Sequence, residues 1–432
     1  MKNTVLIIGA GAAGLMAARA LAIAGKQVTV LEARNRTGGR INTLSDESFF
    51  KHTELGAEFI HGDLPVTLNL LKEAGISYRP ATGEMWTYQN GKFEENGMVI
   101  DDWQLFMERL NELKDDINIY DFLQKEFPGD KYEALRVGVW KYVSGYDTAD
   151  PKDASAFALR NEWQHDQEDA QHRVDGGYCH MISYLASEFK ARGGKIFLNA
   201  VVKDVSWEPG KVTVMTDDGT EYTAAKLLIA MPLGVLKAKK GELGAVSFSP
   251  EIPSYSKALQ QIGFGWIIKI LFEFSRPFWL DNKTEHLTGR NIEKMEFLLS
   301  DEEIPTWWTQ VPDKSNVLTG WLGGPAAADK AKLSDDIITK QGLQSLANIF
   351  KRDPEELKNL LIARRVMNWC TDPFTRGSYA YDTVETPAAR EVLNTPVEGT
   401  IYFCGEYLYE GAAMGTVEAA LSSAVDVVKM MV

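Results

Sequence analysis

One short glycine-rich string near the N-terminus restricts the fold of this chain more than any other feature. The string Gly-Ala-Gly-Ala-Ala-Gly at 9–14 follows an apolar run at 5–8 and opens an alanine- and leucine-rich run at 12–24. The first run predicts a buried strand, the second a helix, and a further run at 28–31 a second strand. A strand, a helix and a strand in succession form a βαβ unit, which implies a parallel sheet. We therefore expect an α/β fold.

The glycine spacing also predicts what this unit binds. Gly9 permits the tight turn, Gly11 lets the backbone approach a pyrophosphate, and Gly14 lets the helix pack closely on the sheet. The free N–H groups at the start of the helix can donate to phosphate oxygens. Glu32 ends the second strand, 18 residues after Gly14, where a carboxylate binds ribose hydroxyls. These residues predict a dinucleotide site but do not distinguish NAD from FAD.

Length and charge limit the remaining possibilities. With 432 residues, of which 45% are hydrophobic, the chain can form two domains with a sizeable core. Its 46 basic and 60 acidic residues give a net charge of -14, which disfavours nucleic acid as a partner and is compatible with cationic substrates. Three scattered cysteines suggest neither a metal site nor a disulfide framework, and favour a reducing compartment.

The two chain ends could be mistaken for membrane segments. The apolar run from Val5 to Gly25 resembles a signal peptide, but Arg19 interrupts it and the βαβ unit explains its glycines. The C-terminal run from Ala424 to Val432 is too short to cross a bilayer. We expect a cytoplasmic protein with no membrane partner, and the sequence does not indicate an oligomeric state.

Periodicity predicts the other elements. Helices are expected at 103–114, 131–143, 181–191, 334–350, 354–361 and 415–430. Strands are expected at 195–198, 201–207, 212–216, 226–230, 263–274 and 400–404, with 217–219 as a hairpin turn between the strands at 212–216 and 226–230. The pattern suggests a nucleotide domain made of residues 1–80, 171–240 and 385–432. A second domain would comprise 81–170 and 241–384.

The residues after the second strand resemble a known family. The string Glu-Ala-Arg-Asn-Arg-Thr-Gly-Gly-Arg at 32–40 resembles the extended FAD fingerprint of the flavin amine oxidases. Further matching segments follow in the family's order, at 55–62, 175–177, 231–232, 369, 377–379, 405–406 and 415–417. The resemblance is to polyamine oxidases and their bacterial relatives more than to monoamine oxidases.

The resemblance implies a fold and a cofactor. The fold would be a Rossmann-like FAD-binding domain with an α+β substrate-binding domain, an architecture shared with p-hydroxybenzoate hydroxylase. The implied FAD-binding residues are Gly9, Gly11, Ala13, Gly14, Glu32, Ala33, Arg34, Gly39, Arg40, Gly56, Ala57, Glu58, Phe59, Val202, Met231, Trp369, Ser378, Gly405, Glu406, Gly415, Thr416 and Val417. Ser378 stands where monoamine oxidases carry the cysteine that bonds flavin, so the FAD should be non-covalent, and no metal is expected. Gly415 either opens a helix whose dipole faces the flavin or only relieves crowding.

The resemblance also implies a reaction. A small cationic amine would lose a hydride to flavin N5, the imine would be hydrolysed, and O2 would reoxidise the flavin to give H2O2. Tyr379 would form one wall of the substrate cage, while Ala412 and Ala413 leave the other wall without an aromatic ring. Such a cage favours a polyamine or another N-substituted alkylamine. Glu162 or Asp166 are candidate partners for a distant positive charge.

Two further residues are catalytic candidates. In the strand at 263–274, alternation alone places Lys269 on a solvent-facing side, whereas the resemblance gives it the role of holding a water against flavin N5. His61, in Ile60-His61-Gly62, resembles a histidine that faces the substrate in animal polyamine oxidases, and histidine suits proton handling near neutral pH.

Two alternatives stay open at this point. An L-amino acid oxidase of the same fold would need an arginine for the substrate carboxylate, and Arg365 and Arg376 are candidates. A flavin-binding scaffold protein could instead present Trp307-Trp308 as an exposed interaction patch, although a buried position or a tunnel wall is also compatible with these tryptophans. Trp86 or Trp307 could also fill the open side of the cage.

Overall fold

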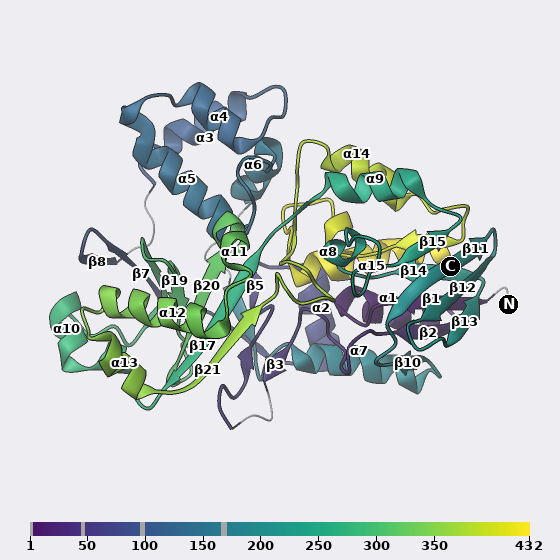
Figure 1. The fold of residues 1–432 in the computed structure, drawn as a ribbon, viewed down its shortest axis with the longest axis horizontal. Coiled ribbons are helices and arrows are strands. Elements are labelled where there is room, and N and C mark those ends of the chain that lie inside the picture. Colours follow the sequence, from purple (N-terminus) through teal and green to yellow (C-terminus); the bar gives the residue numbers. More distant parts are fainter. Residues whose placement is uncertain (1–2, 45–47, 96–99, 166–170) are drawn as a thin grey trace.

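A parallel five-stranded sheet forms the centre of one half of the molecule, on the right in Figure 1. The computed structural model describes residues 3–44, 48–95, 100–165 and 171–432. The strand order is β10-β2-β1-β14-β23, and every neighbouring pair is parallel. These strands are β1 (Thr4–Ile8), β2 (Gln27–Leu31), β10 (Lys195–Phe197), β14 (Lys226–Ile229) and β23 (Ile401–Phe403). The predicted parallel α/β arrangement is therefore confirmed.

Helices cover one face of this sheet. The helices are α1 (Ala12–Ile23), α2 (Pro65–Ala74), α7 (Cys179–Ala191) and α15 (Val417–Met431). α1 lies against both α7 and α15, and its small side chains let the helices approach closely, with Ala17, Ala18 and Leu21 fully buried. The first and last parts of the chain thus form one core.

A smaller sheet and two paired helices cover the other face. The sheet has the order β13-β12-β11-β15, with β11 (Val202–Glu208), β12 (Lys211–Thr216), β13 (Glu221–Ala224) and β15 (Ser247–Ser249). Helices α9 (Pro253–Gln261) and α14 (Thr386–Asn394) pack side by side above the sheet, and α8 (Leu233–Leu236) follows β14.

Two of the expected boundaries are wrong. The turn at 217–219 joins β12 to β13, not to β14, because the polar segment 221–224 adds an edge strand that its composition did not reveal. The last helix begins at Val417 and not at Gly415, because Thr416 is its N-cap and accepts from the Ala419 N–H at 3.2 Å.

An antiparallel-rich seven-stranded sheet forms a second layer, at the lower left of Figure 1. Its order is β21-β17-β20-β19-β18-β7-β8. The strands are β7 (Glu84–Gln89), β8 (Lys92–Glu95), β17 (Ile267–Phe274), β18 (Met295–Ser300), β19 (Thr306–Trp308), β20 (Val317–Gly323) and β21 (Leu361–Asn368). One face packs on α10 (Asn282–Thr288), α12 (Asp335–Ile349) and α13 (Pro354–Leu360), and α11 (Gly324–Lys330) follows β20.

The strand expected at 263–274 is divided in two. β16 (Gly263–Phe264) pairs with β22 (Ala380–Tyr381), and β17 begins only at Ile267. The break at 265–266 lets the chain leave the neighbourhood of residue 380 and enter the seven-stranded sheet between β20 and β21.

Helices and short strands complete the fold. α3 (Trp103–Glu112), α4 (Ile119–Glu126), α5 (Glu133–Gly145) and α6 (Ala156–His165) form a separate apolar cluster, at the upper left of Figure 1. Short strands join the two halves: β3 (Thr43–Leu44) pairs with β4 (Thr53–Glu54), and β5 (Phe59–His61) and β6 (Tyr78–Pro80) pair with β9 (Gln171–Val174). Short 3-10 helices lie at 130–132, 278–280 and 406–408.

The strands of the two large sheets come from different parts of the chain. The parallel sheet takes its strands from the segments assigned to the nucleotide domain, and the seven-stranded sheet takes its strands from the others. β15 and α9 lie after residue 240 yet pack into the core of the first half. The domain limits remain a prediction. No helix among the described residues is long and apolar enough to cross a membrane.

Candidate active site

The glycine string at the end of β1 is shaped by close backbone contacts. Gly9 has φ +105°, and a Cβ there would lie 2.5 Å from the Ala230 carbonyl oxygen. A Cβ at Gly14 would lie 2.0 Å from the Gly9 carbonyl oxygen. At Gly11 the nearest atom to an added Cβ is the Gly38 carbonyl oxygen, at 3.9 Å, so the space over the helix start is open. The string therefore has the tight turn and the open approach that a pyrophosphate needs.

The charges around this opening suit a nucleotide. The N-terminus of α1 has no side-chain cap and no acidic residue in its first turn, so its N–H groups and partial positive charge face the open space. Glu32 is buried at the end of β2, and its carboxylate accepts from the Ala10 N–H at 2.7 Å and from the Arg34 N–H at 2.9 Å. These bonds fix the carboxylate beside the glycine string, where a ribose would lie.

Two arginines connect the predicted cofactor segments to one another. Arg34 donates to both carboxylate oxygens of Asp372, at 2.9 and 2.6 Å. Arg40 donates to Glu406 at 2.8 Å and to the Ser378 carbonyl at 2.7 Å. The structure therefore brings together segments that lie more than 300 residues apart in the sequence, as a single cofactor site requires.

The segment around Gly56 packs against Trp369. A Cβ at Gly56 would lie 1.7 Å from the Arg40 carbonyl oxygen and 3.4 Å from the Trp369 ring. The Trp369 indole N–H donates to the Leu55 carbonyl at 2.9 Å. Ala57, Glu58 and Phe59 continue this segment into β5. The close contacts bring the segment at 55–59 beside Trp369.

Tyr379 and its neighbours lie at the junction of the halves. The Tyr379 hydroxyl donates to the Tyr146 carbonyl, and the Ser378 hydroxyl lies 2.5 Å from that of Thr148. Gly415 has φ +69°, and a Cβ there would lie 2.5 Å from the Tyr379 ring. This contact favours the interpretation that Gly415 relieves crowding, since α15 begins two residues later.

The remaining predicted cofactor residues lie at or near the ends of strands and helices in the first half of the molecule. Val202 is buried at the start of β11, and Met231 follows β14. Ala13 lies in the first turn of α1, and Gly405 follows β23. Ala33, Gly39, Thr416 and Val417 lie in or beside the segments already described.

Lys269 is buried, with a side-chain exposure of 1%. Its ammonium donates to Glu58 at 2.6 Å and to the Gly56 carbonyl at 3.2 Å, and lies 5.1 Å from the centre of the Trp308 ring. The alternation argument for a solvent-facing lysine is therefore wrong. β17 is an interior strand between β20 and β21, and its second face is covered by a cluster in which Leu271 packs with Leu44, Phe50 and Leu55.

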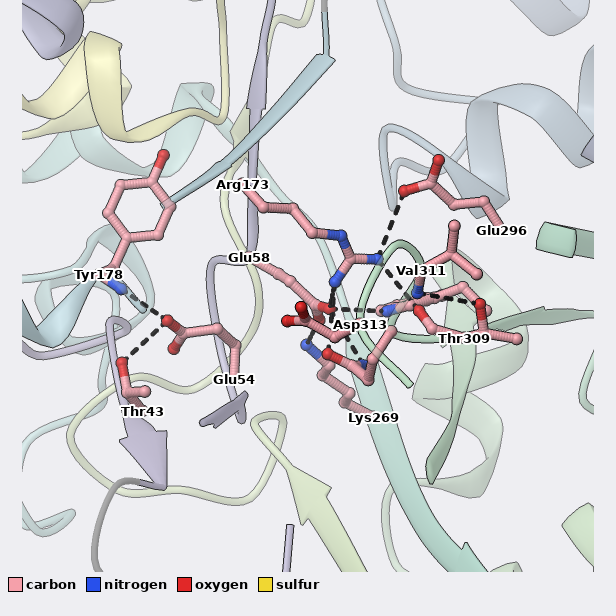
Figure 2. A network of polar contacts seen from close by, with 12 residues as sticks. Thr43, Glu54, Glu58, Arg173, Tyr178, Lys269, Glu296, Thr309, Val311 and Asp313 are labelled. Carbon is pink, nitrogen blue, oxygen red and sulfur yellow. Dashed lines mark hydrogen bonds and ion pairs between the residues drawn. The ribbon is translucent and has the colours of Figure 1, made fainter. Parts of the chain in front are cut away.

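Glu58 carries the charge that balances Lys269 (Figure 2). It also accepts from Arg173 and, at 3.0 Å, from the Trp308 indole N–H. Burial alone would raise the pKa of Glu58, but Lys269 and Arg173 lower it below its ordinary value. The side chain is therefore a buried, ionised carboxylate.

His61 lies in an aromatic setting. Its ring centre is 5.6 Å from that of Tyr146 and 5.9 Å from that of Phe59. Burial lowers the pKa of His61 to about 4, and its Nδ1 has no hydrogen-bond partner among the described residues. The imidazole is neutral near pH 7 and can accept a hydrogen bond.

Comparisons with known proteins agree with this geometry. Residues 12–137 and 104–428 match the profile of the flavin-containing amine oxidoreductases. The chain belongs to this family. Its cofactor is therefore a flavin, and its chemistry is the oxidation of amines.

Named relatives span nearly the whole chain. Polyamine oxidase 4 of Oryza sativa subsp. japonica is 28% identical over 451 residues, which cover 98% of this chain and 87% of the rice protein. Lysine-specific histone demethylase 2 of Homo sapiens is 29% identical, over 94% of this chain and 50% of the human protein.

Solved structures of amine oxidases share the fold. Wild-type putrescine oxidase bound to putrescine has a TM-score of 0.79 at 22% identity, covering 99% of this chain and 98% of its own. Cyclohexylamine oxidase from Brevibacterium oxydans IH-35A has a TM-score of 0.78 at 18% identity, with the same coverage. The two-part architecture expected for a flavin amine oxidase is confirmed.

A narrow acidic pocket lies beside Tyr379 in this family member. It is lined by ten residues that include Asp147, Glu162, Tyr379 and Met414. Burial, followed by the charges of Asp147 and Glu162, raises the pKa of Tyr379 far above its ordinary value. Glu162 was a sequence candidate for binding positive charge, whereas Asp147 was not. Asp166, the other candidate, lies outside the described residues.

Several alternative assignments do not survive the structure. Trp307 and Trp308 are buried, with exposures of 0% and 5%, so they form no exposed patch. Trp86 and Trp307 both lie in the core of the seven-stranded sheet and do not fill the substrate cage. Arg376 donates to the Leu243 carbonyl and forms an ion pair with Glu242. Among the described residues, no cluster of three or more His, Cys, Asp or Glu side chains could hold a metal ion.

The sequence did not reveal Arg173 as part of the site. Arg173 lies two residues before the Asp175-Gly176-Gly177 motif and is buried on β9. Its guanidinium stacks 4.2 Å from the Phe59 ring and pairs with Glu58. An arginine within a short strand next to a cofactor motif is a sequence signal for a site residue. Its partner Glu58, however, lies 115 residues away in the chain.

Proposed function

We propose that this chain is an FAD-dependent oxidase of polyamines or other N-substituted alkylamines. The observation that carries the proposal is the convergence of the nucleotide site, Lys269 and the acidic pocket beside Tyr379 in one family member. When bound, FAD supplies the hydride acceptor and passes electrons to O2, which yields H2O2.

The nucleotide-binding site fits FAD through the contacts already described. Glu32 would bind the ribose hydroxyls, and the helix start after Gly11 would receive the pyrophosphate. Ser378 offers no thiol for a bond to flavin, and its hydroxyl lies within hydrogen-bond distance of Thr148. The FAD is therefore proposed to be non-covalent, and denaturation with acid should release it intact.

The protein contributes charge and a hydrogen-bond acceptor. The Lys269 ammonium would hold and polarise a water at the flavin ring. The amine must be neutral to lose a hydride, and the neutral His61 imidazole can accept a hydrogen bond from its N–H. Rate should therefore rise with pH as the amine deprotonates.

The pocket beside Tyr379 favours a substrate with more than one positive charge. It carries the carboxylates of Asp147 and Glu162 on a wall that continues to Met414. Its free volume is about 20 Å³, enough for a water-sized group such as an ammonium. A nitrogen with chain on both sides could reach the flavin where Ala412 and Ala413 leave the cage open.

A substrate panel tests the proposal. We would compare kcat/KM for spermine, N-acetylspermine, benzylamine, arginine and leucine, with H2O2 as the product measured. Spermine or N-acetylspermine should exceed benzylamine, which loses an aromatic stacking contact worth about 0.5–1.5 kcal/mol. If an amino acid wins by about tenfold, or 1.4 kcal/mol, a carboxylate-binding oxidase is the correct assignment. If none is oxidised, a flavin-binding scaffold replaces it.

A further inference from the structure

Glu58 lies at the centre of four buried charges. Two are acidic, Glu58 and Glu296, and two are basic, Lys269 and Arg173. Their side chains are between 1% and 7% exposed. The set is electrically balanced, as buried charges must be to avoid a large desolvation cost.

Both oxygens of Glu58 are used by protein groups (Figure 2). Oε2 accepts from the Lys269 ammonium at 2.6 Å. Oε1 accepts from Arg173, from the Trp308 indole at 3.0 Å and from Gln310 at 3.4 Å. A carboxylate with this many donors has one orientation.

The hydrogen bonds of Lys269 show how this orientation of Glu58 affects the ammonium. An ammonium has three donors. Lys269 uses one for Glu58 and a second for the Gly56 carbonyl at 3.2 Å, both on the segment at 55–59 that packs beside Trp369. Because the three N–H bonds point to the corners of a tetrahedron, fixing two directions also fixes the third.

We propose that Glu58 is a positioning residue for Lys269. Its carboxylate, held by Arg173 and Trp308, sets the direction of the remaining ammonium N–H toward the flavin side of the segment. The role of that N–H toward the flavin rests on the proposed function, whereas the coupling between Glu58 and Lys269 does not. Arg173 then acts one step further out, because it fixes Glu58 from the side opposite Lys269.

A double-mutant cycle tests this coupling. We would prepare the flavin-loaded wild type, Glu58→Gln, Lys269→Met and the double variant, and measure the flavin reduction potential and Tm of each. If Glu58 acts through Lys269, Glu58→Gln shifts the potential in the wild-type background and leaves it unchanged in the Lys269→Met background. The double variant should also have a higher Tm than Glu58→Gln alone, because the pair Arg173–Glu296 remains charge-balanced.

The rate of a flavin half-reaction is a second quantity to measure in the same double-mutant cycle. Removing a supporting hydrogen-bond partner commonly costs about tenfold or more, so Glu58→Gln should slow a flavin half-reaction by about that factor. The double variant should be no slower than Lys269→Met. Glu58→Asp keeps the carboxylate and should restore part of the potential shift, which keeps the test informative if Glu58→Gln binds flavin poorly.

Glu296→Gln is the matched control. Glu296 is a buried carboxylate in the same set that reaches Arg173 at 3.5 Å, and its recorded contacts do not include Lys269. Its effect on Tm should be the same with and without Lys269. Equal potential shifts for Glu58→Gln in both backgrounds, or no shift in either, would overturn the proposal. The reduction potentials in the wild-type and Lys269→Met backgrounds are measured without substrate. Failure of the amine-oxidase assignment would therefore show separately, in the substrate panel.

Discussion

Glu54 and Glu58 lie four residues apart on one buried segment, and they differ in the charges that surround them. Glu58 faces Lys269 and Arg173. Glu54 accepts only from neutral groups, the Tyr178 N–H at 2.7 Å and the Thr43 hydroxyl at 2.8 Å. Figure 2 shows Glu54 with its bonds to Thr43 and Tyr178, apart from the cluster formed by Glu58, Arg173 and Lys269.

The pKa values of the two groups differ accordingly. Burial raises the pKa of Glu54 to about 7, and the two neutral donors offset only part of this effect. For Glu58, burial acts in the same direction, but the two cations outweigh it and lower the pKa. The comparison shows that the cations within reach, and not burial, decide whether a carboxylate in this segment is ionised.

The most disruptive change should be Glu58→Ala. Among the ion pairs of the described residues, Glu58 is the only carboxylate that contacts Lys269. Its removal leaves the two buried cations, Lys269 and Arg173, with one acid, Glu296. Breaking a buried ion pair from one side costs about 3–5 kcal/mol, so the free energy of unfolding should fall by that amount. Chemical denaturation of the flavin-loaded protein measures it. A loss below about 1 kcal/mol would mean that the cluster is solvated.

A second prediction uses the opposite behaviour of Glu54. Its pKa is about 7 when folded and 4.5 in the unfolded chain, so the folded state binds the proton more tightly. The stabilisation is complete below pH 4.5 and is lost as pH rises through about 7, by about 3 kcal/mol in total. Glu54→Gln is neutral at every pH and should lack this loss.

Unfolding curves at about pH 5 and about pH 8 check this expectation. The difference in unfolding free energy between wild type and Glu54→Gln should change with pH in favour of the variant. His61 titrates with the opposite sign, since its pKa is lowered to about 4, but it is present in both proteins and cancels. A pH-independent difference would show that Glu54 is ionised like Glu58.

The third prediction concerns the rate of the flavin half-reactions after removal of Lys269, the cation that pairs with Glu58. Lys269→Met should leave flavin bound and slow a flavin half-reaction by on the order of 10²-fold, about 2.7 kcal/mol in the barrier, because a preorganised charge is lost. Stopped-flow reduction and reoxidation measure the two half-reactions separately. A rate near that of the wild type in both would return Lys269 to a purely structural role.

The smallest effect is expected at an exposed carboxylate. Asp426 pairs with Lys429 at 2.8 Å on α15, and both side chains are largely exposed. Asp426→Asn should change stability by less than about 0.5 kcal/mol, because water screens such pairs. This variant is the solvent-exposed reference for the buried pair. A loss similar to that of Glu58→Ala would remove the basis of the comparison.

The sequence contained the local parts of this account. The glycine string at 9–14 predicted the first strand, the helix and the nucleotide approach, because each depends on contacts within a few residues. The family motifs indicated Lys269, Tyr379 and His61 as site residues.

The long-range parts were not accessible in the same way. Alternation placed Lys269 toward solvent because a pattern within one strand does not show that Leu44, Phe50, Leu55 and Glu58 cover that face. The edge strand at 221–224 was missed because an exposed edge strand needs few apolar residues. The pairing of Glu58 with Arg173 spans 115 residues, so only the fold reveals it.

The most direct test of the central claim is the reductive half-reaction of the wild-type protein. The flavin-loaded protein would be mixed with spermine without oxygen, and then with O2. We expect the oxidised flavin absorbance to disappear with spermine and to return with O2, releasing one H2O2 for each flavin. If the flavin stays oxidised with every amine, or is reduced only by an amino acid, the assignment as a polyamine or alkylamine oxidase is wrong.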